Sequence, residues 1–222
     1  MKFYLYLEKI GHLFRFLMDL LVGRMIRMAN KRCVALSEEE YKQSIDLLRN
    51  GFELNEKIVK PNPRIATICV LQSVLGLRLS DILNLTVDSI IRDSDRFRLD
   101  IVEQKTGKQR TFTVPTEIYT YIVKYALDNG INKNKKLFNI SKRQVSRHLN
   151  KVFAKMGLNI DKYGSHSYRK MFATQAYIES DYDVELVRVL LQHSNLSITQ
   201  RYLNVSSKKV EAALEKTVKN LI

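Results

Sequence analysis

One stretch of the chain has the alternating pattern of β-structure, and it interrupts a sequence whose pattern is otherwise helical. In residues 96–115, "RFRLDIVEQKTGKQRTFTVP", apolar side chains occur at alternate positions on both sides of Thr106 and Gly107. A period of two around a glycine-containing turn predicts a β-hairpin. The fold class expected is therefore mainly α with a small antiparallel β-hairpin or sheet, an α+β architecture.

Helical periodicity predicts most of the remaining elements. Ser37 is followed three residues later by Glu40, a capping box, and the helix that it opens is expected to end at Asn50 and Gly51. An apolar run predicts a buried helix that ends near Gly76. Further helices are expected, in order, over residues 79–90, 116–127, 141–157, 167–180 and 184–193.

The two ends of the chain each have an amphipathic pattern. Residues 1–28 are rich in apolar side chains, but Arg15, Asp19 and Arg24 interrupt them, so no run reaches the roughly 20 residues of a membrane span. A helix that docks on its own domain or on a partner is expected there, and binding to a membrane surface stays open as an alternative. In residues 207–222, Val210 and Leu214 are among the apolar side chains that share one helical face.

Charge narrows the class of partner. The chain has 222 residues, with 37 Lys and Arg against 23 Asp and Glu, a formal net charge of +14. Such an excess favours a polyanion, because neutralising phosphates releases their counterions. A ribosome-like basic protein and a merely basic surface are the alternatives. Only two cysteines are present and they suggest no disulfide framework, which favours a reducing, cytoplasmic location.

Several polar residues stand at the edges of apolar elements, and each has an ordinary reading. Arg78 and Asp81, three apart, are expected to share a helix face as a surface pair. Lys105, beside the hairpin turn, is typical of a solvated turn residue. Taken singly, His166 is typical of a capping histidine and Arg169 of an exposed arginine. His193 is typical of a histidine at a helix C-terminus, and Tyr202 of a core aromatic.

Taken in order, these residues resemble the motifs of the tyrosine recombinase (phage integrase) family. "GLRLSDILNL" is similar to the family's first arginine motif, "QKTGKQRTFTVP" resembles its lysine hairpin, "HSYRKMFATQAY" its H-x-x-R helix and "LLQHSNLSITQRYLNVS" the segment that leads to its nucleophile. The resemblance covers residues 36–207. The family usually has Leu where Tyr168 stands, Gly where Gln192 stands, and often Glu where Asp81 stands.

The resemblance implies the catalytic-domain fold of tyrosine recombinases and a transesterification of DNA. Tyr202 is then the nucleophile that forms a 3′-phosphotyrosyl ester, which a free hydroxyl later attacks. Arg78 and Arg169 clamp the non-bridging oxygens of the transition state with planar forks that lysine cannot reproduce.

The other candidates receive supporting roles from the same resemblance. Lys105 gives a proton to the departing 5′ oxygen, and His166 acts as the general acid and base. His193 donates a hydrogen bond to the phosphate, and Asp81 orients the site. No cofactor and no metal ion are expected.

The implied domain organisation is an N-terminal amphipathic extension (1–35), a catalytic domain (36–207) and a C-terminal amphipathic helix (208–222). The layout is similar to that of short invertases. The expected partners are double-stranded DNA at a specific site, copies of the chain in a tetramer on two sites and accessory DNA-bending proteins, with no membrane. The tail 208–222 would contact a neighbouring protomer, or pack on its own domain.

The reaction could be integration, excision, inversion or resolution of a DNA element. A non-catalytic DNA-binding regulator or accessory factor of the same fold is one alternative, and a type IB topoisomerase-like nickase is another. Six intact candidate residues favour the enzyme over the regulator, because a protein that only binds DNA does not need all of them.

Overall fold

The computed structural model describes residues 33–203. The chain divides into two compact units, Met1–Cys33 and Val34–Ile222, and the elements described below belong to the second. Most of the expected extension 1–35 and all of the expected tail 208–222 lie outside the described residues.

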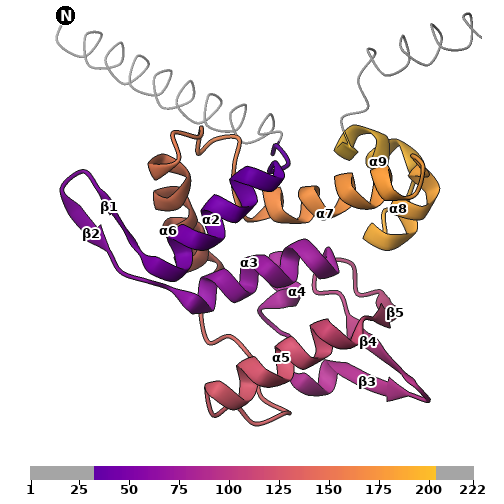
Figure 1. Cartoon of the computed structure of the whole chain (residues 1–222). Helices are drawn as coiled ribbons and strands as arrows, with labels where there is room; N and C mark the ends of the chain where they lie inside the picture. The colour runs from indigo at the N-terminus through magenta and orange to yellow at the C-terminus, as the bar shows by residue number, and fades with distance from the viewer. Residues whose placement is uncertain (1–32, 204–222) are drawn as a thin grey trace, which may run out of the picture. The chain divides into compact units, whose positions relative to one another are not determined.

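Helices dominate the described chain, and two small antiparallel sheets accompany them, which confirms the expected fold class (Figure 1). The elements are, in order, α2 (Glu38–Asn50), β1 (Phe52–Leu54), β2 (Lys57–Val59), α3 (Pro63–Leu75), α4 (Leu79–Ile82), the 3₁₀ turn η1 (Val87–Ser89), β3 (Ile90–Asp93), β4 (Arg96–Val102), β5 (Gln109–Val114), α5 (Thr116–Asp128), α6 (Lys142–Lys155), α7 (Ser165–Glu179), α8 (Val184–Leu191) and α9 (Leu196–Leu203). No helix of the described residues has the length and apolarity to cross a membrane.

The helix starts and stops that the sequence marks most clearly are confirmed. The Ser37 hydroxyl accepts the backbone N–H of Glu40 at 3.1 Å, and the Glu40 carboxylate accepts the N–H of Ser37 at 2.8 Å. Gly51 follows the last residue of α2. Gly76 ends α3 with a left-handed backbone (φ 58°), a conformation that glycine adopts without steric cost.

The hairpin is confirmed, but the helix expected over residues 79–90 is wrong. β4 and β5 pair with Leu99 opposite Phe112, and a third strand, β3, pairs with the other edge of β4. The helix α4 ends after one turn, at Ile82. Thr86 and Ser89 then bond each other's backbone N–H groups and start η1, which leads into β3.

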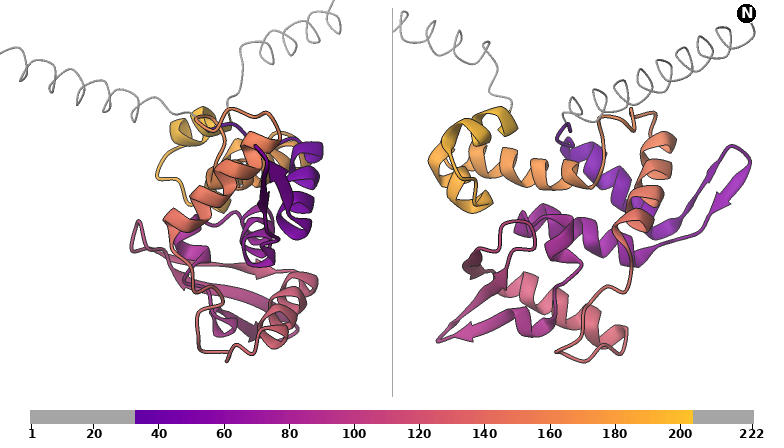
Figure 2. Two further views of the ribbon diagram at one scale, coloured as in Figure 1. Left: turned by 90° about the vertical axis from the view of Figure 1, so that its left-hand side faces the viewer. Right: turned by 180° about the vertical axis from the view of Figure 1, so that it is seen from behind.

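A second hairpin, β1–β2, was not predicted. It turns at Asn55 and Glu56, which both have positive φ values of 48° and 60°. Such turns usually contain glycine, and none stands here, so the local turn signal is missing. In Figure 1 and Figure 2 this hairpin extends away from the helices that flank it.

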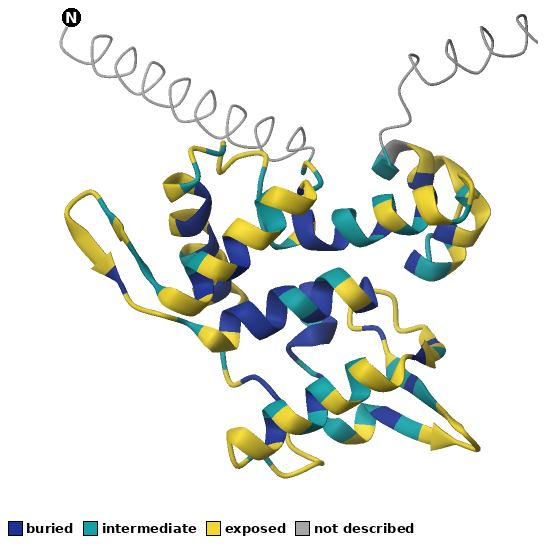
Figure 3. Cartoon of the chain, viewed as in Figure 1, coloured by how far each residue is buried: buried dark blue, intermediate teal, exposed yellow. Residues whose placement is uncertain are grey.

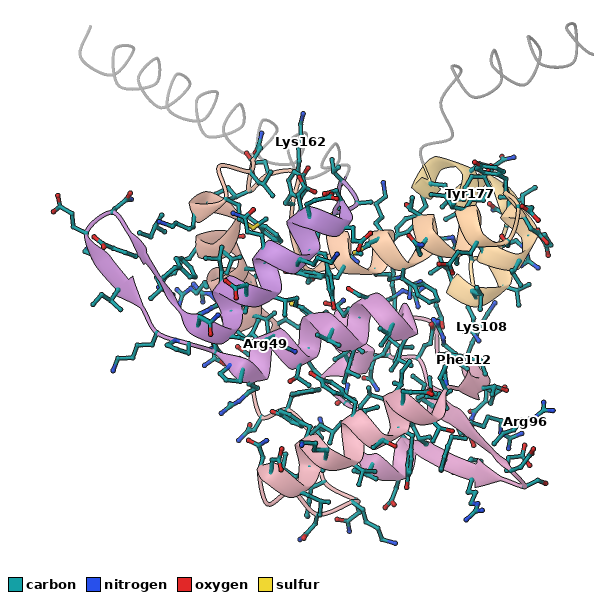
Figure 4. All side chains as sticks on the ribbon, in the orientation of Figure 1. Arg49, Arg96, Lys108, Phe112, Lys162 and Tyr177 are labelled. Carbon is teal, nitrogen blue, oxygen red and sulfur yellow. The ribbon has the colours of Figure 1, made fainter. Side chains whose placement is uncertain are left out.

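A large apolar cluster, hereafter the main cluster, centres on α3, which is dark over most of its length in Figure 3. The helix α7 packs along α3. A separate, smaller group, hereafter the C-terminal cluster, consists of Ala173, Tyr177, Val187 and Leu191, at the far end of α7 and on α8. Figure 4 labels Tyr177 at this junction with α8 and α9. Leu77 and Leu79, which flank Arg78, belong to the main cluster, whereas Tyr202 packs on the C-terminal cluster.

Candidate active site

The turn after α3 presents Arg78. A side chain at Gly76 would clash with the ring of Phe172 on α7, so only glycine lets α7 approach this turn. Arg78 precedes α4 with extended backbone (φ −70°, ψ 151°). The expectation that Arg78 and Asp81 share a helix face is therefore wrong: Arg78 is the residue before the helix, and Asp81 lies within it.

The carboxylate of Asp81 connects α4 to the hairpin. Its Oδ1 accepts the backbone N–H of Gln104 at 2.9 Å, and the residue is 3% exposed. Gln104 immediately precedes Lys105, which stands exposed at the turn between β4 and β5. Asp81 thus fixes the chain beside Lys105 instead of contacting Arg78 by its side chain.

Three of the candidate residues line one open cavity of about 530 Å³: Arg78, Lys105 and His166. His166 comes from the first turn of α7. The other lining residues are mostly polar and come from α4, the hairpin, α6 and α7: Leu79, Ser80, Gln104, Lys142, Ser146 and Ser165. Two lysines, an arginine and three hydroxyl groups around one cavity suit an anionic ligand such as a phosphodiester.

Arg169, one turn after His166, is buried and 2% exposed. One of its terminal nitrogens donates to the carbonyl oxygen of Gly76 and the other to that of Leu191, at 2.9 Å for the second. Each of these nitrogens carries a second hydrogen that remains able to donate. Burial lowers the pKa of Arg169 to about 10, so the guanidinium stays charged at neutral pH.

His193 and Tyr202 form a second group, on the segment that runs from α8 into α9. Their rings meet edge to face, 5.3 Å between centroids. Nδ1 of His193 shares a hydrogen bond of 3.0 Å with the hydroxyl of Thr199, which is fully buried. The ammonium of Lys170 lies 5.3 Å from the centre of the Tyr202 ring. Tyr202 itself packs on the C-terminal cluster.

Both histidines of the site are neutral at pH 7. Burial first, and then the charges of Arg169 and Arg78, lower the pKa of His193 to about 4. His166 has an exposed surface at the cavity, yet partial removal from water and the same arginines, together with Lys105, lower its pKa as well. A neutral imidazole can accept a proton, and the imidazolium that results can give it back, as general acid–base chemistry requires.

The structure therefore arranges the seven predicted residues in two groups with Arg169 between them. Arg78, Lys105 and His166 line the cavity, and Asp81 supports its hairpin side. His193 and Tyr202 contact each other and do not line the cavity. Arg169 links the two groups because it donates to the carbonyl oxygens of Gly76 and Leu191, which lie two residues before Arg78 and His193 respectively. Within residues 33–203, no three His, Cys, Asp or Glu side chains gather as metal ligands would.

Two buried charged residues of the site were missed from the sequence. Glu103 and Arg110 are each 1% exposed and form an ion pair of 3.0 Å between carboxylate and guanidinium. A signal for them existed, because they continue the apolar alternation of their strands as charged residues at inward positions. A third missed residue, Thr199, carries no local signal on its helix.

Residues 34–209 match the model of the phage integrase family. Among curated proteins, the chain is 30% identical over 200 residues to the tyrosine recombinase XerA of Pyrococcus furiosus, covering 85% of this chain and 64% of that protein. It is 30% identical over 178 residues to the probable integrase/recombinase YoeC of Bacillus subtilis, covering 77% of this chain and 94% of that protein. The chain thus spans just under two thirds of the length of XerA.

Two solved structures illustrate the likeness in fold. The XerH site-specific recombinase bound to a palindromic difH substrate, a post-cleavage complex, superposes with a TM-score of 0.61 at 19% identity, covering 83% of this chain and 53% of that one. The catalytic domain of bacteriophage HP1 integrase gives a TM-score of 0.56 at 17% identity, covering 83% and 95%. The fold of the described chain is that of a recombinase catalytic domain.

Proposed function

Because the chain belongs to the phage integrase family, we propose that it is a site-specific DNA recombinase that cleaves and rejoins double-stranded DNA through a 3′-phosphotyrosyl intermediate. The observation that carries this proposal is the cavity on which Arg78, Lys105 and His166 converge, with buried Arg169 behind it. Such an assembly of donors fits a phosphodiester better than an uncharged ligand. Residues 36–207 are proposed to form the catalytic domain.

In the proposed cleavage step, the phenolic oxygen of Tyr202 attacks the phosphorus and the bond from phosphorus to the 5′ oxygen breaks. Neutral His166 accepts the phenolic proton, and Lys105 gives a proton to the 5′ oxygen, which leaves as a hydroxyl. The DNA strand then ends in a 3′-phosphotyrosyl ester. One phosphate ester has replaced another, so a second 5′ hydroxyl can reverse the step without ATP.

Three hydrogen-bond donors are proposed to stabilise the negative charge that grows on the non-bridging oxygens. Arg78 and Arg169 provide guanidinium forks, the largest contribution in sites of this kind. His193 donates from Nε2: if the Thr199 hydroxyl donates to Nδ1, the single proton of the neutral ring lies on Nε2. Asp81 is proposed to orient the hairpin through the N–H of Gln104.

Binding of the DNA backbone is supported by the charge of the chain and of α6. Exposed basic side chains follow this helix from the cavity toward its C-terminal end: Lys142, Arg143, Arg147 and Lys151. Lys142 itself lines the cavity. Contacts of this kind release counterions, so the measured affinity for duplex DNA should fall steeply between 50 and 200 mM salt, by roughly 10³-fold for six phosphate contacts.

Recombination joins two sites, and we propose that four copies of the chain assemble on them. The apolar face of residues 207–222, which includes Val210 and Leu214, is assigned to contacts between protomers. Deletion of 208–222 should leave binding to one site intact and abolish pairing of two sites in a gel-shift assay. Normal pairing by the truncated chain would contradict this role.

The proposed function is tested by covalent capture. The full chain is incubated with fragmented genomic DNA of its source, stopped with detergent, and protein-bound DNA is purified and sequenced. Recovered fragments should share one sequence and carry the protein on a 3′ phosphate. Binding without any covalent product would instead support a regulator, and covalent products without a common sequence would support a topoisomerase-like nickase.

A further inference from the structure

Glu103 is a buried carboxylate at the centre of the candidate site, and none of the proposed steps uses it. It lies one residue beyond β4 and is 1% exposed. Its Oε2 accepts hydrogen bonds from Arg78 and, at 2.9 Å, from the Thr106 hydroxyl, and its Oε1 accepts from Arg110 at 3.0 Å. A carboxylate removed from water is stable only when partners of this kind surround it.

The register of the hairpin accounts for this burial. Glu103 continues the alternation of Leu99 and Ile101, so its side chain is directed to the same face of the sheet. Arg110 stands opposite Ile101 on β5 and is directed to that face too. The hairpin therefore delivers one negative and one positive side chain to the core side of the sheet, next to the turn that carries Lys105.

The partners of Glu103 belong to three separate parts of the site. Arg78 is the residue before α4, and Thr106 is in the turn beside Lys105. Arg110 extends the connection, because its other terminal nitrogen donates to the carbonyl oxygens of Leu75 at 3.3 Å and Leu190 at 2.6 Å.

These two carbonyls neighbour the pair that Arg169 uses, those of Gly76 and Leu191. Two arginines therefore join the end of α3 to the end of α8 side by side. The negative charge next to them is that of Glu103, which is ion-paired with one of the two, Arg110.

The carboxylate is ionised at neutral pH. Burial raises the pKa of Glu103, but the hydrogen bonds from Thr106, Arg110 and Arg78 outweigh this effect and bring the pKa below its usual value. A neutral amide in its place would accept fewer hydrogen bonds and would leave two guanidinium charges close together without a counter-charge.

We propose that Glu103 is a positioning residue, whose carboxylate holds Arg78, the Lys105 turn and, through Arg110, the end of α8 in the arrangement that receives the scissile phosphate. This inference rests on the proposed function and assigns one more residue to it. Because Glu103 is buried away from any ligand, its loss should alter the rate of the reaction and not the affinity for DNA. It acts on the phosphate only through the residues it holds.

The test compares the full chain with Glu103→Gln on the duplex recovered by covalent capture. At saturating DNA, the rate of covalent adduct formation should fall by about 10- to 100-fold, by analogy with the loss of a partner that orients a metal ligand, while the dissociation constant for DNA changes by less than about threefold. Glu103→Asp, which keeps the charge, should recover part of the rate. Asp93→Asn serves as the matched control, because Asp93 is an exposed carboxylate paired with Arg98 in the same sheet.

A folded Glu103→Gln variant with a rate within about twofold of the wild type would overturn the inference. If that variant does not fold, Thr106→Val removes one arm of the network and should still lower the rate, whereas Thr113→Val, at an exposed position of the same hairpin, should not.

The physical link is tested separately from activity by a double-mutant cycle. The melting temperatures of Glu103→Gln, Arg78→Gln and the double variant should be non-additive, because each single change already breaks the same pair. Additive values would overturn the inference. If the wild type forms no adduct at all, the proposed recombinase function fails, and the cycle still decides whether Glu103 holds Arg78.

Discussion

The two halves of the candidate site are anchored very differently. The turn with Arg78 and the hairpin with Lys105 rest on the main cluster, which includes Leu71, Leu75 and Leu77 of the α3 region at 0% exposure. Tyr202, whose ring contacts that of His193, packs on the C-terminal cluster, which has four buried members. Free energy of local opening follows the number of buried apolar contacts. We therefore expect the half with Arg78 and Lys105, hereafter the rigid half, to open locally at a higher cost than the half with His193 and Tyr202, hereafter the lightly anchored half.

Two buried arginines join these halves. Arg110 and Arg169 donate to adjacent carbonyls at the end of α3 and to adjacent carbonyls at the end of α8, Leu190 and Leu191. The segment with His193 and Tyr202 is thus connected to the end of α3 by hydrogen bonds from two charged side chains, and its own apolar cluster has only four buried members. Substitutions that break either connection test whether the two halves of the site are anchored differently.

The largest effect is expected from Arg169→Lys, which breaks this connection and removes the proposed phosphate clamp together. Lysine keeps the charge but cannot make two directed bonds to Gly76 and Leu191 while also donating to phosphate. The rate of adduct formation should fall by on the order of 10²-fold or more. Arg98→Lys, on the exposed side of the sheet, is the control. A loss of only a few-fold would show that Arg169 contacts the backbone of the DNA without specificity.

The next effect separates the two clusters by cavity formation. Leu71→Ala and Leu191→Ala each remove a fully buried side chain, at a cost of about 2–5 kcal/mol of unfolding free energy. Hydrogen exchange should rise throughout the domain for Leu71→Ala. For Leu191→Ala it should rise chiefly in α8 and α9, with α3 still protected. Equal loss of protection in both variants would mean that the halves unfold as one.

A smaller effect is expected from Thr199→Val, which removes the hydroxyl beside Nδ1 of His193 at nearly constant volume. The ring then loses the hydrogen-bond partner of Nδ1 that is proposed to favour the Nε2–H form, and the rate of adduct formation should fall several-fold. Binding to DNA should not change, because Thr199 is fully buried. Thr113→Val again provides the control, and an unchanged rate in Thr199→Val would remove Thr199 from the site.

The smallest effect is expected in the folding stability at acidic pH. The pKa of His193 is lowered to about 4 in the folded chain from about 6.5, so below pH 6.5 the unfolded state binds the extra proton. Folding stability should therefore decline as pH falls from about 6.5 to about 4, and the lowered pKa of His166 acts in the same direction. Urea unfolding of His193→Asn should show a shallower decline than the wild type over this range. An identical slope would contradict the neutral, half-buried state of His193.

The sequence predicted the features that depend on near neighbours. The capping box at Ser37, the stop at Gly76 and the hairpin all follow from residues within a few positions of each other. The strand β3 could not be foreseen, because it forms only when β4 is available to pair with it. Tyr168, where the family usually has Leu, keeps its burial by donating from its hydroxyl to Ser44 on α2, a contact between residues 124 positions apart.

The residues of the candidate site were predictable from the sequence, but the hydrogen bonds that connect them were not. The resemblance supplied the seven residues. It did not supply the hydrogen bonds that join Glu103 to Arg78 and Thr199 to His193, or those of Arg110 to Glu103, Leu75 and Leu190, which cross between separate parts of the chain. Gln192 stands where the family has Gly and adopts the left-handed backbone (φ 51°) that glycine would favour. Its side-chain amide donates to the Gln109 carbonyl at 3.0 Å, a further contact from α8 to the hairpin.

We propose that Tyr202, on the lightly anchored half, attacks a phosphate held by the rigid half. The direct measurement is mass spectrometry of proteolytic peptides from the captured covalent complex. A nucleotide is expected on the peptide that contains Tyr202. Tyr202→Phe should form no adduct while DNA binding is retained, and Tyr182→Phe, which alters an exposed tyrosine beside the same cluster, should form a normal adduct. A nucleotide on any other residue, or an adduct from Tyr202→Phe, would contradict the assignment of Tyr202 as the nucleophile.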